Sequence, residues 1–185
     1  MSKALIVYGT RYGATASTSQ EIADILRQEG LEVQVANTKE EKIKDINPYD
    51  LVIVGSGIQI NRWTGEPEDF LKKFQKQLAA KKVALFVSCG SASKLYADKP
   101  EDTSQTKIKY LDEKAAKYNL HPVALGFFGG VYNFNKTPWW SKKAMAVERP
   151  KIAAAYKETE PGVYDTRDWN AIRNWAKQLA QTVRP

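Results

Sequence analysis

The hydrophobic positions of this chain fall into short apolar runs that alternate with longer stretches of helical periodicity. Runs of strand length predict five strands, at Lys3–Tyr8, Glu32–Ala36, Asp50–Gly55, Lys82–Ser88 and Pro122–Phe128. Apolar residues spaced three and four apart predict four helices, at Ala14–Gln28, Glu66–Leu78, Thr103–Tyr118 and Thr166–Val183. The third strand is apolar throughout its centre, as a strand covered on both faces of a parallel sheet is expected to be.

This alternation of strand and helix patterns predicts an α/β fold. Five strands separated by helices imply a parallel sheet with helices on both faces, most simply in the order 2-1-3-4-5. That order places a ligand crevice where the first and third strands diverge, at the carboxyl end of the sheet. The chain has 185 residues and no internal repeat, so we expect a single domain over residues 1–185.

The loop between the first strand and the first helix has the composition of an anion-binding site. Glycines at positions 9 and 13 let the backbone curl around an anion, and two threonines add hydroxyl donors. The helix that follows presents unpaired N–H groups with a partial positive charge. The predicted loop comprises Thr10, Arg11, Tyr12, Gly13, Ala14 and Thr15.

Residue spacing separates this loop from other phosphate loops. A nucleoside-triphosphate loop needs a lysine before its Ser/Thr, but Ala14 precedes Thr15 here. A dinucleotide loop needs three closely spaced glycines, and no third glycine accompanies Gly9 and Gly13. The remaining pattern, T-x-x-G-x-T, suits one terminal phosphomonoester held by hydroxyls and amides.

Two other protein classes share this strand order, but this chain lacks the residues that their chemistry requires. A phospho-receiver domain needs carboxylates where the first and third strands end, but those ends read Tyr8–Thr10 and Gly55–Gly57. A low-molecular-weight phosphatase needs a cysteine inside the first loop, and the single cysteine of this chain is Cys89.

The segment Ile6–Thr15 resembles the FMN-phosphate loop of the flavodoxin family. That loop reads aliphatic, aliphatic, aromatic, any, Ser/Thr, two of any, small, any, Thr, and each position is satisfied. The usual alanine four residues further on is Ser19, a departure that affects helix packing more than chemistry. The resemblance implies a flavodoxin-like three-layer sandwich with FMN as the cofactor.

The resemblance also places the flavin ring at the loop after the third strand. The residues expected there are Ser56, Gly57, Ile58, Gln59, Arg62 and Trp63. Glycine and serine permit backbone hydrogen bonds to the polar edge of the ring, Ile58 or Trp63 supplies a stacking face, and Arg62 stabilises the negative charge of reduced flavin. For Trp63 a cap over the following helix is an equally open interpretation.

The loop after the fourth strand is expected to flank the ring from the other side, through Ser88, Cys89, Gly90 and Ser91. Cys89 suits a small buried filler better than a redox thiol. One histidine and one cysteine disfavour a zinc site or a histidine-based triad. Because the flavin carries the chemistry, we expect no catalytic side chain and no metal.

Charge distinguishes this chain from shuttle flavodoxins, which are typically acidic. It has 28 Lys and Arg against 21 Asp and Glu, a formal net charge of +7. Between Val131 and Lys157 stand six basic residues and one acidic residue, together with Trp139 and Trp140. This stretch lies in an insertion at about residues 129–165, far longer than the usual strand–helix connection of about 2–6 residues.

The insertion has several interpretations. It binds an anionic small molecule, an anionic membrane surface or an acidic redox protein, or it is a solvated loop anchored by its tryptophans. Nucleic acid is disfavoured because no recognised binding motif accompanies the charge. The chain contains no apolar stretch of membrane-spanning length, and we expect no signal peptide. We therefore expect a cytoplasmic protein that touches the inner membrane face at most peripherally.

The whole chain resembles the flavodoxin-type protoporphyrinogen IX dehydrogenases that pass electrons to menaquinone. The similarity covers the first loop, Gly55–Trp63, Lys99–Thr106, the insertion and the ending Tyr164–Trp169. It implies an FMN-dependent oxidoreductase with a porphyrin-like substrate and a quinone acceptor. The insertion departs from the family in being less apolar and in carrying Pro150, which we expect to break a helix. The alternatives are an electron-shuttle flavodoxin and, less favoured, an NAD(P)H:quinone reductase.

Overall fold

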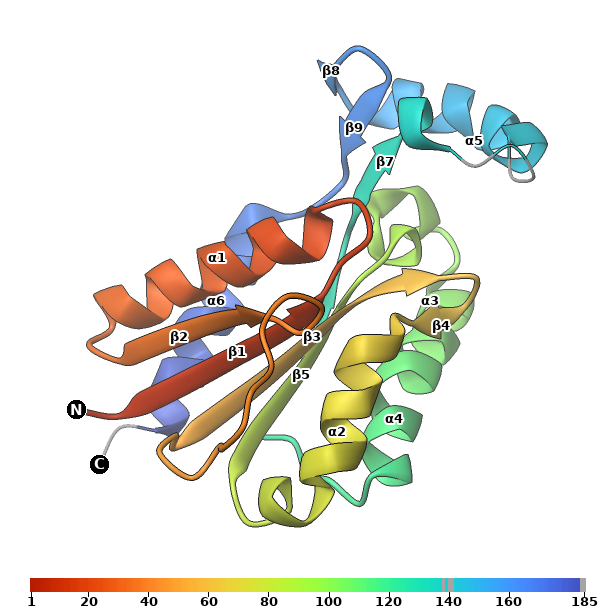
Figure 1. The fold of residues 1–185 in the computed structure, drawn as a ribbon. Coiled ribbons are helices and arrows are strands. Elements are labelled where there is room, and N and C mark those ends of the chain that lie inside the picture. Colours follow the sequence, from red (N-terminus) through yellow and green to blue (C-terminus); the bar gives the residue numbers. More distant parts are fainter. Residues whose placement is uncertain (138, 140–141, 184–185) are drawn as a thin grey trace.

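The central sheet of the protein has the predicted strand order. The computed structural model describes residues 1–137, 139 and 142–183. Its parallel strands run in the order β2-β1-β3-β5-β6, which confirms the 2-1-3-4-5 arrangement (Figure 1). These strands are β1 (Lys3–Gly9), β2 (Glu32–Asn37), β3 (Leu51–Gln59), β5 (Lys82–Ser88) and β6 (Ala124–Phe128).

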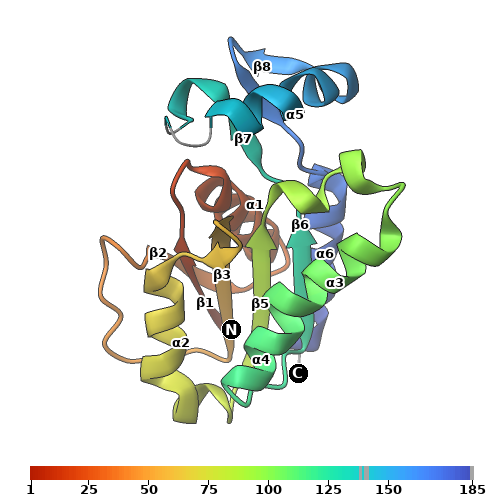
Figure 2. The ribbon, with the colours of Figure 1, turned by 90° about the vertical axis from the view of Figure 1, so that its right-hand side faces the viewer.

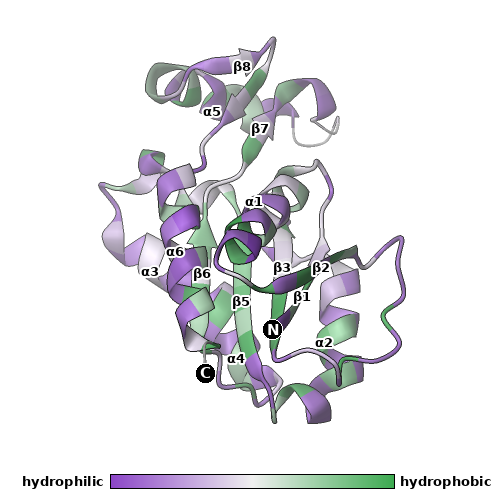
Figure 3. Cartoon of the chain, turned by 90° about the vertical axis from the view of Figure 1, so that its left-hand side faces the viewer, coloured by the Kyte–Doolittle hydropathy of each residue, from purple (hydrophilic) through white to green (hydrophobic). Residues whose placement is uncertain are grey.

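Helices cover both faces of this sheet (Figures 1 and 2). Helices α1 (Ala14–Gln28) and α6 (Trp169–Thr182) lie on one face, and α2 (Gly65–Leu78), α3 (Pro100–Lys107) and α4 (Glu113–Lys117) lie on the other. Neighbouring residues of one strand enter different cores: Ile53 packs with α1 and α6, whereas Val54 packs with α2. Strands buried on both faces therefore read as continuous apolar runs, as their colouring in Figure 3 shows.

The predicted helix Thr103–Tyr118 requires a correction. It begins earlier, at Pro100, whose missing N–H costs nothing in a first turn. A π-helical turn at Ile108–Asp112 then separates α3 from α4. Within this turn the Tyr110 carbonyl accepts a hydrogen bond from the Trp63 indole at 2.9 Å. The wider turn therefore coincides with a contact to the loop after β3.

Beyond the predicted strand, β3 continues into a hairpin that the sequence did not indicate. The short β4 (Arg62–Trp63) pairs with it in antiparallel fashion. Ile60 and Asn61 form the turn, with φ of +47° and +57°. Two successive residues in this region make the primed turn that matches the twist of a hairpin. An isoleucine is rare in this conformation because its branched side chain crowds the backbone.

The insertion folds into a second, small sheet and a helix. Strands β7 (Val131–Asn133), β9 (Val163–Asp165) and β8 (Glu158–Glu160) pair in the order β7-β9-β8, and α5 (Lys142–Ala155) connects β7 to β8. The expectation that Pro150 breaks a helix is wrong, because α5 continues through this residue. Proline removes one hydrogen bond, which a mostly exposed helix replaces with water.

The insertion stands over the carboxyl ends of the parallel strands (Figures 1 and 2). Two segments of the chain connect the insertion to the sandwich. Where they meet it, Gly130 and Thr166 exchange hydrogen bonds of 2.9–3.2 Å. Trp140, which the sequence singled out, lies outside the described residues. None of the helices within the described ranges is long and apolar enough to cross a membrane.

Candidate functional site

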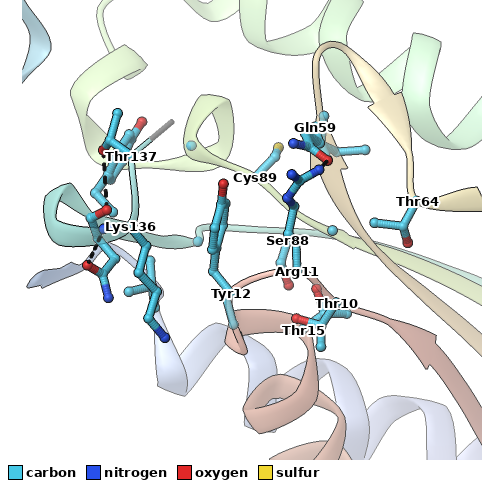
Figure 4. A pocket seen from close by; sticks show the side chains of 18 of the residues that line it. Thr10, Arg11, Tyr12, Thr15, Gln59, Thr64, Ser88, Cys89, Lys136 and Thr137 are labelled. Atoms are coloured by element: carbon cyan, nitrogen blue, oxygen red, sulfur yellow. Dashed lines mark hydrogen bonds between the residues drawn. The ribbon is translucent and has the colours of Figure 1, made fainter. Parts of the chain in front are cut away.

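A cavity of about 300 Å³ opens at the carboxyl ends of β1, β3 and β5, in the predicted crevice (Figure 4). Most of the predicted site residues line it, namely Thr10, Arg11, Tyr12, Ala14, Thr15, Gly57, Ile58, Gln59, Ser88, Cys89 and Gly90. The loops after β1, β3 and β5, which are distant in sequence, therefore line one cavity, and the insertion lines it as well.

The loop after β1 forms an anion cradle at the floor of this cavity. The Gly13 N–H donates to Thr10 Oγ1 at 3.0 Å, which closes the loop into a tight turn. Helix α1 begins at the next residue, so the N–H groups of its first turn have no intrahelical acceptor. The Thr15 side chain is buried and lies beside these donors (Figure 4). The arrangement offers several donors to one anion.

Two glycines give the cradle its shape. Gly13 has φ of +94°, a left-handed conformation that glycine adopts without a steric cost, and it turns the loop into α1. Gly57 lies so near the cradle that a Cβ built on it would stand 3.2 Å from Thr15 Oγ1. The absence of a side chain at Gly57 therefore keeps the space beside the Thr15 hydroxyl open.

The hairpin after β3 lines another side of the cavity, and hydrogen bonds at its base and its tip fix its position. Ser56 Oγ accepts from the Thr64 N–H at 3.0 Å and donates to the Gly57 carbonyl at 2.9 Å, which closes the base of the hairpin. At the tip, the Tyr110 hydroxyl donates to Asn61 Oδ1 at 3.0 Å. These contacts hold Ile60 at the cavity, where the residue is 69 % exposed.

Arg11 connects the phosphate loop with the hairpin. Its guanidinium donates to Gln59 Oε1 across the cavity (Figure 4). The same guanidinium lies 5.9 Å from the centroid of the Tyr12 ring. Tyr12 itself is exposed and stands upright at the opening of the cavity. The cavity mouth is therefore rimmed by an aromatic ring and a cation.

The end of β5 supplies a hydroxyl and a thiol of different character. Ser88 Oγ is buried at the cavity and has no hydrogen-bond partner among the described residues, so a ligand in the cavity could supply one. Burial raises the pKa of the Cys89 thiol to about 12, although N–H groups of Ser91 and Ala92 act in the opposite direction. Cys89 is therefore a neutral thiol at neutral pH, in line with its interpretation as a filler.

The insertion contributes a wall that the sequence did not assign to the site. Its lining residues are Gly130, Val131, Tyr132, Asn133, Lys136, Thr137 and Met145. The Asn133 side chain accepts from the N–H groups of Asn135 and Lys136, which fixes the short 3₁₀ turn Phe134–Lys136 on the rim. The basic and aromatic composition of the insertion was the available signal, but it did not show which side chains face the cavity.

Five predicted residues do not line the cavity. Trp63 is 6 % exposed and packs in the core on the α2 side of the sheet, so its indole does not line the cavity. Arg62 lies on the outer strand of the hairpin and is exposed. Gly13 and Ser56 shape the walls through their backbone and hydroxyl contacts, and Ser91 lies in a 3₁₀ turn beside the cavity.

Comparison with known proteins identifies the family. The family model described as "Flavodoxin domain" matches residues 5–159. The chain belongs to the flavodoxin family. Among solved structures, this flavodoxin-family chain is similar to a short-chain flavodoxin associated with a non-canonical PDU bacterial microcompartment, with a TM-score of 0.60, 15 % identity and complete coverage of both chains. It is also similar to two-electron reduced Megasphaera elsdenii flavodoxin, with a TM-score of 0.55, 16 % identity, and coverage of 95 % and 98 %.

Sequence relatives include an enzyme and a flavodoxin. Protoporphyrinogen IX dehydrogenase [quinone] of Escherichia coli K12 is 23 % identical over 178 residues, which cover 96 % of this chain and 94 % of the relative. A flavodoxin of Maridesulfovibrio salexigens is 27 % identical over 114 residues, which cover 59 % of this chain and 77 % of the relative. Both relatives support redox function of the flavodoxin type.

FMN is the cofactor of this flavodoxin-family protein, and the residues of the cavity fit it. The cradle provides one anion site, as a single phosphate group requires, and the chain has no glycine triplet for a pyrophosphate. The buried Ser88 hydroxyl, which has no partner in the described part of the chain, and the backbone of Gly57 and Gly90 suit the polar edge of a planar ring. Two isoleucines, Ile58 and Ile60, offer apolar surface for its faces.

Proposed function

We propose that this protein is an FMN-dependent oxidoreductase that takes electrons from protoporphyrinogen IX or a similar anionic tetrapyrrole and passes them to a quinone. The observation that carries the proposal is the wall that the insertion adds to the flavin cavity. An electron shuttle needs only an accessible flavin edge, whereas a walled cavity gives a small molecule a surface to bind. The near full-length match to protoporphyrinogen IX dehydrogenase supports this choice.

The residues of the cavity divide into two tasks under this proposal. Bound FMN supplies the redox chemistry. The first turn of α1 and the hydroxyls of Thr10 and Thr15 hold its phosphate, while Ser88 and Gly90 contact the ring. Insertion residues then exclude water from the ring and orient the second ligand. Both tasks are positional, so no side chain of the site needs to act as a nucleophile.

Lys136 is our candidate for recognising the anionic groups of the substrate. It lines the cavity, and its ammonium forms no hydrogen bond or ion pair with any described residue. In Figure 4 its side chain lies to the left of Tyr12. A lysine that is held at the rim by its backbone and left uncompensated is suited to pair with a carboxylate.

We also propose that the outer surface of the insertion touches an anionic membrane, where a quinone resides. Trp139 is 84 % exposed, and Val147 is also exposed. Lys142 and Lys143 stand at the beginning of α5 and are exposed. Exposed aromatic and aliphatic side chains next to basic residues are typical of peripheral contact with anionic lipid.

The second candidate is an electron carrier that docks to an acidic redox protein. Exposed side chains at the cavity mouth, Tyr12 and Ile60, favour it, because a protein partner reaches the flavin edge through such a rim. The net charge of +7 provides the complementary docking potential. The flavodoxin match over 114 residues is also in keeping with a carrier.

An anaerobic steady-state assay separates the two candidates. Purified protein with bound FMN is mixed with protoporphyrinogen IX and a menaquinone analogue, and porphyrin formation is followed by fluorescence. If the protein is an enzyme, it turns over these small molecules without a protein partner. Lys136→Met then raises the KM for protoporphyrinogen IX, whereas Lys143→Met, which removes an exposed lysine from α5, leaves this KM unchanged. A carrier shows no turnover until a protein partner is added, and that outcome refutes the enzyme proposal.

A further inference from the structure

The walls of the flavin cavity carry positive charge without a compensating carboxylate. Arg11 of the phosphate loop and Lys136 of the insertion line it, and none of its described lining residues is an aspartate or a glutamate. The other titratable groups of the lining are Tyr12, Cys89 and Tyr132. Burial raises the pKa of the Cys89 thiol and of the Tyr132 phenol, so both groups are neutral at neutral pH. The cavity therefore presents a positive potential to its ligand.

Arg11 extends from the phosphate loop to the hairpin after β3. Its Nη1 donates to Gln59 Oε1, and the guanidinium lies 5.9 Å from the centroid of the Tyr12 ring. Gln59 stands between Ile58 and Ile60, the two residues that offer apolar surface to the flavin ring. The other N–H groups of the guanidinium have no hydrogen-bond partner among the described residues. The structure therefore holds this cation at the wall assigned to the ring, with donors left for a ligand.

We propose that Arg11, positioned by Gln59, pairs with the negative charge that the ring of bound FMN acquires on reduction and so raises the midpoint potential of the flavin. Reduction adds two electrons to the ring, and the ring carries one negative charge when only one proton accompanies them. A cation beside the ring favours this charged form. The planar guanidinium suits the polar edge of a ring because it presents several donors in one plane. Arg62, to which the sequence gave this role, does not line the cavity.

The inference goes beyond the proposed function, because it concerns bound FMN whatever its electron donor and acceptor are. Its test therefore uses neither tetrapyrrole nor quinone. The competing role for Arg11 is a contact to the FMN phosphate. The phosphate has the same charge in both oxidation states, so a lost phosphate contact weakens oxidised and reduced FMN alike and leaves the midpoint potential unchanged. A lost ring contact weakens reduced FMN more and lowers the potential.

Anaerobic titration of the protein with bound FMN against reference dyes measures this potential. The variants are Arg11→Met, the conservative Arg11→Lys and the matched control Arg62→Met, which removes an arginine from the same hairpin outside the cavity. Both arginines are exposed, so we expect all three variants to fold. Arg11→Met should weaken the binding of reduced FMN relative to oxidised FMN by about tenfold, which for a two-electron couple lowers the potential by about 30 mV.

The other variants show whether this effect belongs to the cation at the ring. Arg11→Lys keeps the charge and should retain most of the potential, and Arg62→Met should leave it unchanged. An unchanged potential in Arg11→Met overturns the proposal. If Arg11→Met weakens the binding of oxidised FMN at an unchanged potential, Arg11 binds the phosphate instead. An equal drop in Arg62→Met shows a general effect of net charge and also overturns the proposal.

The pH dependence of the potential gives a second readout. Below the pKa of the reduced ring, reduction takes up two protons with the two electrons, and above it reduction takes up one, so the potential falls less steeply with pH. A nearby cation lowers that pKa. Arg11→Met should therefore move the change of slope to higher pH. A change of slope at the same pH in this variant and in the original chain contradicts the pairing.

A last variant tests the positioning role of Gln59. Gln59→Leu removes the acceptor that holds the guanidinium and should lower the potential by less than Arg11→Met does. Combined with Arg11→Met, it should have no further effect, because the group that Gln59 holds is already absent. A further drop of the potential in the double variant would show that Gln59 acts on the flavin independently of Arg11 and would contradict the positioning role.

Discussion

The guanidinium of Arg167 donates a hydrogen bond of 2.9 Å to the carbonyl oxygen of Ala14, 153 positions earlier in the sequence. Ala14 opens α1 in the anion cradle, whereas Arg167 follows β9, the strand that returns from the insertion. The Arg167 side chain is 7 % exposed and also pairs with Asp165 of β9 at 2.7 Å. One buried arginine therefore fastens the insertion to the phosphate-binding turn.

We expect Arg167→Met to lower both stability and FMN affinity. The change leaves the Asp165 carboxylate and the Ala14 carbonyl without this partner, and breaking a largely buried pair costs about 3 kcal/mol, the lower end for such pairs because Asp165 retains some contact with water. Urea unfolding and FMN titration measure the two effects. Arg173→Met, which breaks an exposed pair with Glu21, is the matched control. Equal behaviour of the two variants would contradict this role.

The cradle gives a second prediction. Thr15→Val keeps the shape of a buried side chain but removes its hydroxyl, so FMN should bind more weakly by about 1.5–3 kcal/mol, the range for a hydrogen bond to a charged group. Isothermal titration of the protein free of flavin checks this. Thr159→Val on β8, far from the cavity, should bind FMN like the original chain. Full affinity in Thr15→Val places the phosphate elsewhere.

Trp63 gives a prediction that follows from its buried position. Trp63→Phe removes the 2.9 Å bond from the indole N–H to the Tyr110 carbonyl and should destabilise the protein by about 1–3 kcal/mol. The absorbance and midpoint potential of bound FMN should change little, because the indole does not line the cavity. Spectroelectrochemistry measures both quantities. A large shift of the flavin midpoint potential without loss of stability would indicate instead that Trp63 contacts the flavin ring.

The Cys89 thiol gives a pH-dependent prediction. Its pKa is raised to about 12 in the folded protein, above the ordinary value of about 9 that applies after unfolding. Between these two pH values the unfolded chain loses a proton that the folded protein keeps, so the contribution of Cys89 to stability declines as pH rises through this window. Cys89→Ser should remove that part of the alkaline loss in denaturant titrations. The folded thiol should also resist disulfide reagents near pH 8 and react once urea unfolds the chain.

The sequence predicted the local parts of this site. The pattern from Ile6 to Thr15 fixes a strand, a turn and a helix start within ten residues, so its geometry needs no distant information. The sequence predicted the loop at the end of β5 in the same way, from an apolar run followed by small residues. The sequence did not show that Trp63 is buried away from the cavity lining, because its indole position depends on the π-helical turn around Tyr110, whose carbonyl accepts its hydrogen bond.

The insertion shows what the sequence could not give. Its strands have three residues each, too few for a periodic pattern, and β7 pairs with β9 across about thirty positions. Tyr132 and Lys136 reach the cavity only through that pairing and through the Asn133 cap. The basic and aromatic composition of the insertion showed that the segment was unusual, but the orientation of its side chains depends on tertiary contacts.

The central claim is that the insertion makes the flavin cavity a site for a small anionic reductant, and a single-turnover experiment tests it most directly. Oxidised protein with bound FMN is mixed anaerobically with protoporphyrinogen IX in a stopped-flow instrument, with no quinone and no second protein present. Our account predicts that the visible absorbance of the flavin bleaches as porphyrin fluorescence appears, at a rate that saturates with the concentration of protoporphyrinogen IX. Flavin that stays oxidised under these conditions, yet is reduced by a redox protein, would contradict the account.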